Sequence, residues 1–473
     1  MSTIAMDYFS IAKGFSVIFA VTSILNEIRV VCFHYPSLKE RNYMKEYRSY
    51  IAYRGNVIYS QDKDTLISKE NSYILVADGI VKEICSQLPD GFPEENIIDW
   101  GNRIIIPGFC DMHVHAPQFL QRGIGMDREL LDWLSTYTYP TEAKFKDKDH
   151  ARKVYAWFVD ELLRQGTLHV NCFPSIHYEA SEILFDILEQ RGLFAFTGKL
   201  NMDQNSPEYY IEDTEQSIID TERFIQQHQK TGNVRTAIIP RFAITCSEKQ
   251  LAGLGKLSEK YDVPVHSHMC EAINEMKINR ELFPDYKNGA DIFYQNNLLG
   301  QRPTIMAHCI FMDDDVLALM KNPNCMAVHC PDATANINAG GIMPVKKFLE
   351  MGINLAIGSD IGSGANLSIA RGIASTIQHS KIRNMFDPTW EAVNLAEAFY
   401  MATRSGGRYF KNVGAFDEGY CFNALVIDDS NMCGEGLTPV ERLERFCYAG
   451  DDRNIRMRYI LGNEVEIQNF RYC

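Results

Sequence analysis

The sequence is short of three features: long apolar runs, closely paired cysteines and an excess of basic residues. The apolar stretch at residues 15–25 (FSVIFAVTSIL) has 11 residues, fewer than the about 18 needed to span a bilayer, so we expect no membrane partner. The 13 cysteines are an odd number without a CxxC pair, which argues against a disulfide framework and favours a reducing compartment, the cytosol. A net charge of −14 argues against a nucleic-acid partner.

The first 43 residues differ in character from the rest and form an atypical N-terminal extension. A targeting role has weak support, because only Lys13 against Asp7 precedes the apolar run and no clear cleavage site follows it. A docked helix and a non-native start before Met44 are the other two interpretations of this segment.

Residues 104–118 (IIIPGFCDMHVHAPQ) contain the pattern around which the chain is organised. Residues 104–106 and 109–114 predict two short strands separated by a Pro-Gly turn. His113 and His115 are two residues apart, so in an extended strand both side chains point the same way and can bind one ion. HxH alone fits one packed and one solvated histidine equally well.

Eight apolar, strand-like runs recur along the chain with helical patterns between them. This alternation predicts an α/β fold, a (β/α)8 TIM-like barrel of the metal-dependent hydrolase type with its active site at the carboxyl ends of the strands. The runs are residues 109–114, 166–173, 193–203, 234–242, 263–271, 303–309, 325–331 and 353–360, with helical periodicity at, for example, residues 180–191, 214–229 and 313–321.

Short alternating runs at both ends of the chain predict a small discontinuous β domain beside the barrel. Residues 47–105, 421–429 and 453–467 have this character. We therefore expect four parts: the extension 1–43, the first part of the β domain 44–105, the barrel 106–410, and the second part of the β domain with the C-terminal tail 411–473.

Histidines and a carboxylate at the ends of these runs predict a metal site. His113, His115, His268 and Asp360 offer three nitrogens and one oxygen, a set that suits one Zn²⁺ per subunit, or Fe²⁺, better than Mg²⁺ or Ca²⁺. Such an ion lowers the pKa of bound water to about 7 and so supplies hydroxide. Asp360 can also accept the proton of the water, and we expect His308 to orient the water or polarise the electrophile.

Glu271 follows His268 by three residues and suits a proton shuttle, although a surface glutamate at the start of a helix fits the same spacing. A dinuclear site would need a carboxylated lysine after the fourth run, and Lys199 ends the third run instead. One metal is therefore expected. His169, His177, His266 and His329 are interpreted as packed core histidines rather than outer partners of the metal ligands.

Four motifs together resemble the mononuclear amidohydrolase superfamily: PGFCDMHVH, HMCE, MAHC and IGSD. Within it, HAPQ, the block MDRELLDWLSTYTYPTEAKF at residues 126–145, PRF and GKLNMD are similar to the guanine deaminases. The resemblance extends from Met44 to the C-terminus. It implies hydrolysis of guanine to xanthine and ammonia in purine catabolism, and a homodimer.

The resemblance also implies roles for individual residues. It implies that His113, His115, His268 and Asp360 bind the metal. It also implies that Glu271, Asp360 and His308 take part in catalysis. The substrate contacts it implies are His115, Ala116, Pro117, Gln118, Arg241, Phe242, His268, Glu271, His308 and Asp360.

The chemistry of guanine agrees with these contacts. Its lactam edge presents an acceptor beside a donor, and the amide of Gln118 has one group of each kind. Arg241 can only donate, which disfavours the amino group that adenine has at that place. Phe242 or Trp133 could cover the face of the ring, although core packing fits Trp133 equally well.

One departure from the family pattern keeps alternatives open. Ala333 and Thr334 in CPDATAN stand where the family usually has Ser-Asn. A related aminohydrolase or chlorohydrolase acting on a pterin, a cytosine analogue or a triazine is the second hypothesis, and a non-catalytic scaffold is the third. A polynucleotide deaminase of the HxE…PCxxC type is excluded, because both motifs are absent.

Overall fold

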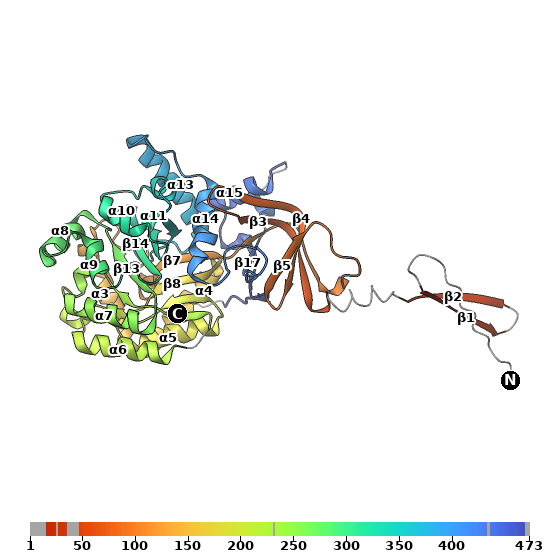
Figure 1. The fold of residues 1–473 in the computed structure, drawn as a ribbon, viewed down its shortest axis with the longest axis horizontal. Coiled ribbons are helices and arrows are strands. Elements are labelled where there is room, and N and C mark those ends of the chain that lie inside the picture. Colours follow the sequence, from red (N-terminus) through yellow and green to blue (C-terminus); the bar gives the residue numbers. More distant parts are fainter. Residues whose placement is uncertain (1–15, 25–26, 36–46, 230–231, 433–435, 469–473) are drawn as a thin grey trace.

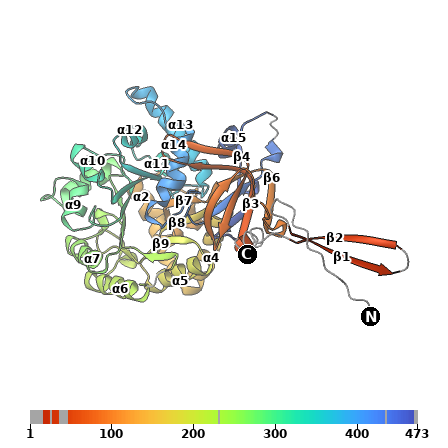
Figure 2. The same cartoon turned by 45° about the vertical axis from the view of Figure 1, so that its right-hand side comes forward.

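The computed structural model describes residues 16–24, 27–35, 47–229, 232–432 and 436–468. Figure 1 shows a large body of helices and short strands beside a strongly twisted sheet, with a two-stranded hairpin farther out. Figure 2 gives the same arrangement from a second direction.

Two four-stranded parallel sheets form the centre of the large body. Their orders are β11-β9-β8-β7 and β13-β14-β15-β16. Each of the eight predicted runs contains at least one strand, and the described residues also form a small parallel pair, β10-β12. The strands are β7 (Phe109–His115), β8 (Thr167–Phe173), β9 (Phe194–Thr197), β10 (Leu200–Asn201), β11 (Val234–Thr236), β12 (Ile239–Pro240), β13 (Val265–Met269), β14 (Thr304–His308), β15 (Cys325–His329) and β16 (Asn354–Ile357).

The third and fourth runs are each broken into two strands. At Gly198, between β9 and β10, a Cβ atom would lie 2.0 Å from the carbonyl oxygen of Ala237, so only glycine permits this approach of the two chains. The two parallel sheets meet through backbone contacts, a bridge between Ile238 and Val265 and a 2.8 Å hydrogen bond from Asp360 N to His113 O. A closed eight-stranded barrel stays a prediction.

Helices surround the parallel sheets in Figure 1. The three predicted helical stretches correspond to α5, α6 and α10. Side-chain caps fix two of their starts, because Asp213 accepts a hydrogen bond from Gln216 N and Asp313 from Val316 N. The main helices are α4 (Lys148–Arg164), α5 (Tyr178–Gln190), α6 (Thr214–Gln227), α7 (Glu248–Tyr261), α8 (Ile273–Leu282), α9 (Gly289–Gln295), α10 (Asp314–Met320), α11 (Pro331–Asn336), α12 (Val345–Glu350), α13 (Ile369–Phe386), α14 (Leu395–Tyr400) and α15 (Pro439–Ala449).

A seven-stranded sheet combines strands from both ends of the chain, in the order β19-β18-β17-β6-β3-β4-β5. Its strand β6 leads directly into β7, and at the junction a Cβ on Gly108 would lie 2.4 Å from the Leu168 side chain. The sheet therefore positions the first strand of the site. Its members are β3 (Tyr50–Ser60), β4 (Leu66–Ala77), β5 (Ile80–Cys85), β6 (Ile97–Pro107), β17 (Ala424–Ile427), β18 (Ile455–Ile460) and β19 (Asn463–Glu464).

Of the three interpretations of the N-terminal segment, the docked helix is contradicted for the described residues. Residues 16–35 contain two antiparallel strands, β1 (Ser16–Ile24) and β2 (Glu27–Tyr35). The run is rich in Val, Ile and Phe, which favour extended backbone. The other residues of the predicted extension lie outside the described part of the chain. Among the residues that the structure describes, no helix has the length and apolar character to cross a membrane.

Candidate active site and metal centre

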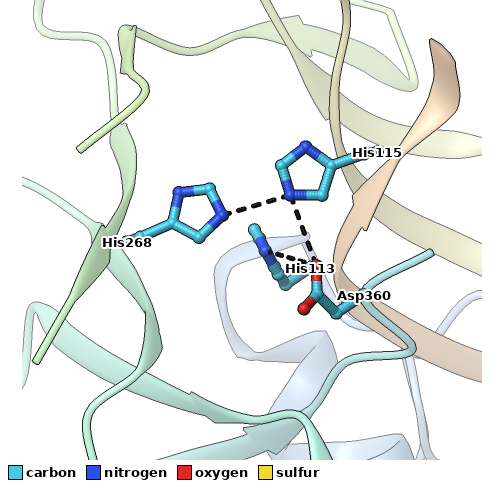
Figure 3. A group of neighbouring side chains, drawn as sticks. All are labelled: His113, His115, His268 and Asp360. Carbon is cyan, nitrogen blue, oxygen red and sulfur yellow. Dashed lines mark hydrogen bonds and ion pairs between the residues drawn. The ribbon is translucent and has the colours of Figure 1, made fainter. Parts of the chain in front are cut away.

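Four side chains from three strand ends meet at one point (Figure 3). His113 and His115 lie on β7, and their Nε2 atoms are 3.2 and 3.3 Å from the same carboxylate oxygen, Oδ1 of Asp360. His268 on β13 brings its Nε2 atom to 3.1 Å from that of His115. One ligand atom from each residue lies within 4.8 Å of the others, and all four residues are buried. The two histidines of β7 therefore point the same way, as the alternation of a strand predicts.

The outward nitrogens of two of these rings are held by neighbours. His268 Nδ1 lies 2.6 Å from the carbonyl oxygen of Arg241, which requires a proton on Nδ1 and leaves Nε2 with a free lone pair. His113 Nδ1 lies 2.9 Å from Nε2 of His266. His113 Nε2 lies 3.2 Å from Asp360 Oδ1, and among the described residues it has no partner in hydrogen-bond geometry. Three imidazole nitrogens and a carboxylate that face one point fit a divalent transition metal such as zinc.

The protonation states also suit metal binding, which requires neutral imidazole and ionised carboxylate. Burial lowers the pKa of His115 to about 4 and that of His268 well below the usual value. Burial alone would raise the pKa of Asp360, but the neighbouring His113 holds it well below its ordinary range. At neutral pH the group is therefore ready to bind a cation.

Glu271 and His308 lie beside this group, and the pKa of Glu271 is shifted in the opposite direction to that of Asp360. Burial, and then the negative charge of Asp360, raise the pKa of Glu271 well above that of an ordinary glutamate. Burial lowers the pKa of His308 to about 3. His308 Nε2 is 3.4 Å from Glu271 Oε1 and 3.7 Å from Asp360 Oδ2. A protonated carboxylic acid thus faces a neutral imidazole, an arrangement that can donate a proton.

A pocket opens next to the four-residue group. Gln118, Arg241 and Phe242 line it, as does Trp133, whose Nε1 donates to Ile124 O at 3.0 Å. Its lining residues are His115, Gln118, Leu130, Trp133, Leu134, Arg241, Phe242, His268, Glu271, Asp360 and Ser363.

Three residues expected to contact the substrate are not among the described residues that line this pocket: Ala116, Pro117 and His308. His308 lies 3.4 Å from Glu271, which does line it, and its own contact with substrate stays a prediction. Ala116 and Pro117 begin the 3-10 helix η3 (Ala116–Gln121), whose third residue is Gln118. They therefore set the position of Gln118, and their own contact with substrate stays a prediction.

A model of the amidohydrolase family matches residues 104–465. The chain belongs to the amidohydrolase family. It is 36% identical over 441 residues to guanine deaminase of Dictyostelium discoideum, covering 88% of this chain and 98% of that protein. Among solved structures, a guanine deaminase from C. acetobutylicum with bound guanine in the active site is 42% identical with a TM-score of 0.86, covering 88% of this chain and 100% of that one. The structure of E. coli guanine deaminase is 26% identical with a TM-score of 0.81, covering 89% of this chain and 100% of that one.

Sequence reasoning missed two polar residues at the site of this amidohydrolase, and also Leu130 and Leu134 of the pocket lining. Glu142 is the last residue of the helix α3 (Tyr139–Glu142), and its carboxylate accepts from Arg241 Nη1 at 2.6 Å and from Gln118 Nε2 at 2.7 Å. Ser363 donates to Asp360 Oδ2 at 2.6 Å. Glu142 ends the YTYPTE block, which gave the strongest resemblance and could have pointed to it.

The remaining candidates lie away from the pocket or behind the ligands. Lys199 forms an ion pair with Glu212 and is not among the described residues that line the pocket. His266, interpreted as a packed histidine, is buried but contacts His113.

The CPDATAN motif, in which Ala333 and Thr334 depart from the family pattern, contains the short helix α11. Its Thr334 donates to Cys330 O at 2.9 Å. Asn336 at the end of the motif donates to Ser363 O at 2.7 Å, which holds the loop that carries Ser363. Neither Ala333 nor Thr334 is among the described residues that line the pocket.

Proposed function

We propose that this chain is a guanine deaminase that hydrolyses guanine to xanthine and ammonia. The observation that carries the proposal is that one pocket is lined both by residues that can bind the base and by catalytic and metal-binding residues. Its lining includes Gln118 and Arg241, which can bind the base, together with His268, Glu271 and Asp360 of the catalytic and metal-binding residues. The named relatives support the proposal, since the first two share 36% and 42% of aligned residues with this chain.

His113, His115, His268 and Asp360 would hold one Zn²⁺ per subunit. When bound, such an ion lowers the pKa of a coordinated water to about 7 and makes a nucleophile available at neutral pH. The donor set supports zinc, and Fe²⁺ has the same preference for imidazole.

Gln118 and Arg241 orient the base. The amide of Gln118 offers a donor and an acceptor to the lactam edge, and Arg241 adds a donor to the oxygen. A purine with an amino group at that place would leave a buried donor of Arg241 unpaired, which costs about 1 to 3 kcal/mol. Phe242 and Trp133 line the same pocket and can cover the ring face.

Glu271 moves the protons. It enters the reaction protonated and gives its proton to a ring nitrogen as water adds to C2. It then takes over the proton that Asp360 removed from the water and delivers it to the amine as the C2–N bond breaks. The proton of the new C2 hydroxyl returns to Glu271 as the carbonyl of xanthine forms. Asp360 is ionised and accepts the proton that the attacking water loses. His308 Nε2 faces both carboxylates and orients the water between them.

Several further features of the enzyme belong to this proposal. Parallel bridging between the two four-stranded sheets supports a closed (β/α)8 barrel. Strands from both chain ends in one sheet support a small β domain built from residues 44–105 and 411–473, with β6 extending to Pro107. Ten cysteines in the described residues are unpaired, which supports the cytosol. A homodimer and a place in purine catabolism rest on the family resemblance.

A substrate panel tests the proposal. Purified protein is incubated with guanine, adenine, a pterin, a cytosine analogue and an aminotriazine, and released ammonia is measured. Guanine should give the highest kcat/KM. A higher value for another heterocycle would favour the related aminohydrolase, and release from none would favour the scaffold.

A further inference from the structure

Glu142 is a buried carboxylate to which the proposed reaction gives no role. It is fully buried, and Arg241 and Gln118 beside it are 2% and 1% exposed. An ionised carboxylate in such a place is costly unless every oxygen is paired. Burial would raise the pKa of Glu142, but the Arg241 guanidinium holds it below the usual value, so the carboxylate is charged.

Each carboxylate oxygen of Glu142 holds a different pocket residue. Oε2 accepts from Arg241 Nη1 at 2.6 Å, and Oε1 accepts from Gln118 Nε2 at 2.7 Å. The other end of the Gln118 amide is also fixed, because Oε1 of Gln118 accepts from Gly362 N at 3.0 Å. The amide therefore has one orientation, which decides where its donor and acceptor face the pocket.

The guanidinium of Arg241 is confined from a second side. Its central carbon lies 5.4 Å from the ring centroid of Tyr139, three residues before Glu142 on α3. Of its five N–H donors, one is committed to Glu142. The backbone oxygen of Arg241 accepts a hydrogen bond from Nδ1 of His268. Arg241 is thus a single rigid connection between α3 and the metal-binding group.

We propose that Glu142 is the positioning residue for guanine recognition. It aligns Arg241 and Gln118, and it cancels the charge of Arg241 so that the pocket favours an uncharged base over an anionic one. This inference rests on the proposed function and names the specificity device of that site. A free guanidinium would attract anions, whereas a paired one presents directed donors without a net charge.

Glu142→Gln keeps the volume and removes the charge. We expect KM for guanine to rise about 10- to 100-fold while kcat changes less than fivefold. Inhibition by urate, a purine anion at neutral pH, should become at least fivefold tighter, because no negative charge then compensates that of Arg241. Loss of fold alone cannot produce these opposite changes. Metal content, measured on the same sample, should stay at the wild-type value.

Glu397→Gln is the matched control. Glu397 is fully buried, accepts from Lys346 Nζ at 2.6 Å and from Asn394 N at 2.9 Å, and does not line the pocket. The Glu397→Gln substitution should lower the melting temperature and leave both KM for guanine and urate inhibition at wild-type values. If Glu142→Gln does not fold, Glu142→Asp keeps the charge and shortens the reach, and it should raise KM without tighter urate binding.

Unchanged KM in a folded Glu142 variant would overturn the inference, as would equal weakening of guanine and urate. Failure of the wild-type protein to release ammonia from guanine would instead overturn the proposed function, so the two failures are distinguishable.

Discussion

Nδ1 of His268 lies 2.6 Å from the carbonyl oxygen of Arg241. Through this contact the residue after β12 fixes the ring of a candidate metal ligand on β13, while its side chain lines the pocket. Arg241 therefore contacts the metal-binding group through its backbone and the proposed substrate pocket through its side chain. A shift of this backbone would disturb both parts of the site together.

Replacing Glu271 by glutamine should abolish turnover without loss of metal. The variant cannot donate the carboxylic proton, and Glu271 is outside the four-residue group. We expect kcat to fall about 10²- to 10⁴-fold. Steady-state kinetics and elemental analysis of one preparation check this, and a near-normal kcat would remove Glu271 from the mechanism.

Arg241→Lys should raise KM for guanine about tenfold or more. An ammonium is a point charge, and it cannot hold Glu142 and present directed donors to the base as a planar fork does. Initial rates over a range of guanine concentrations measure the effect. Kinetics identical to wild type would mean that the side chain does not contact the substrate.

His169 should make the stability of the fold sensitive to pH. Asn423 Oδ1 accepts from Leu461 N, so its Nδ2 is the atom that donates to His169 Nε2 at 2.9 Å. His169 is therefore neutral in the folded chain, and burial lowers its pKa to about 4. The unfolded chain takes up a proton below its ordinary pKa of 6.5, so this contribution to stability is complete above pH 6.5 and is lost as the pH falls towards 4.

Comparison with His169→Gln isolates this contribution, because glutamine can accept from Asn423 and does not titrate. Between pH 7 and pH 5, the wild type should lose roughly 2 kcal/mol of its unfolding free energy relative to the variant. Denaturant unfolding at the two pH values measures the difference. A difference that does not change with pH would show that His169 is charged in the folded state or is already released.

Local rules were sufficient for the metal-binding group and for most of the strands. The spacing of His113 and His115 fixes their common direction, and each other ligand follows an apolar run, so the carboxyl ends of strands bring them together. The breaks in the third and fourth runs could not be predicted, because they depend on the approach of Gly198 to Ala237, a contact made only in the folded chain.

Long-range contacts account for what the sequence did not reveal. The partners of Glu142 are 24 and 99 residues away, and no local pattern encodes such a pairing. The N-terminal apolar run was uncertain for a local reason. Its length suits a short helix or a strand, and only composition distinguishes the two.

The most direct test measures xanthine formation and bound metal on the same sample of purified protein. One equivalent of metal should accompany activity, chelation should remove both, and Zn²⁺ should restore both. A metal-free protein that converts guanine at the full rate would contradict the central claim that His113, His115, His268 and Asp360 hold the ion on which the reaction depends.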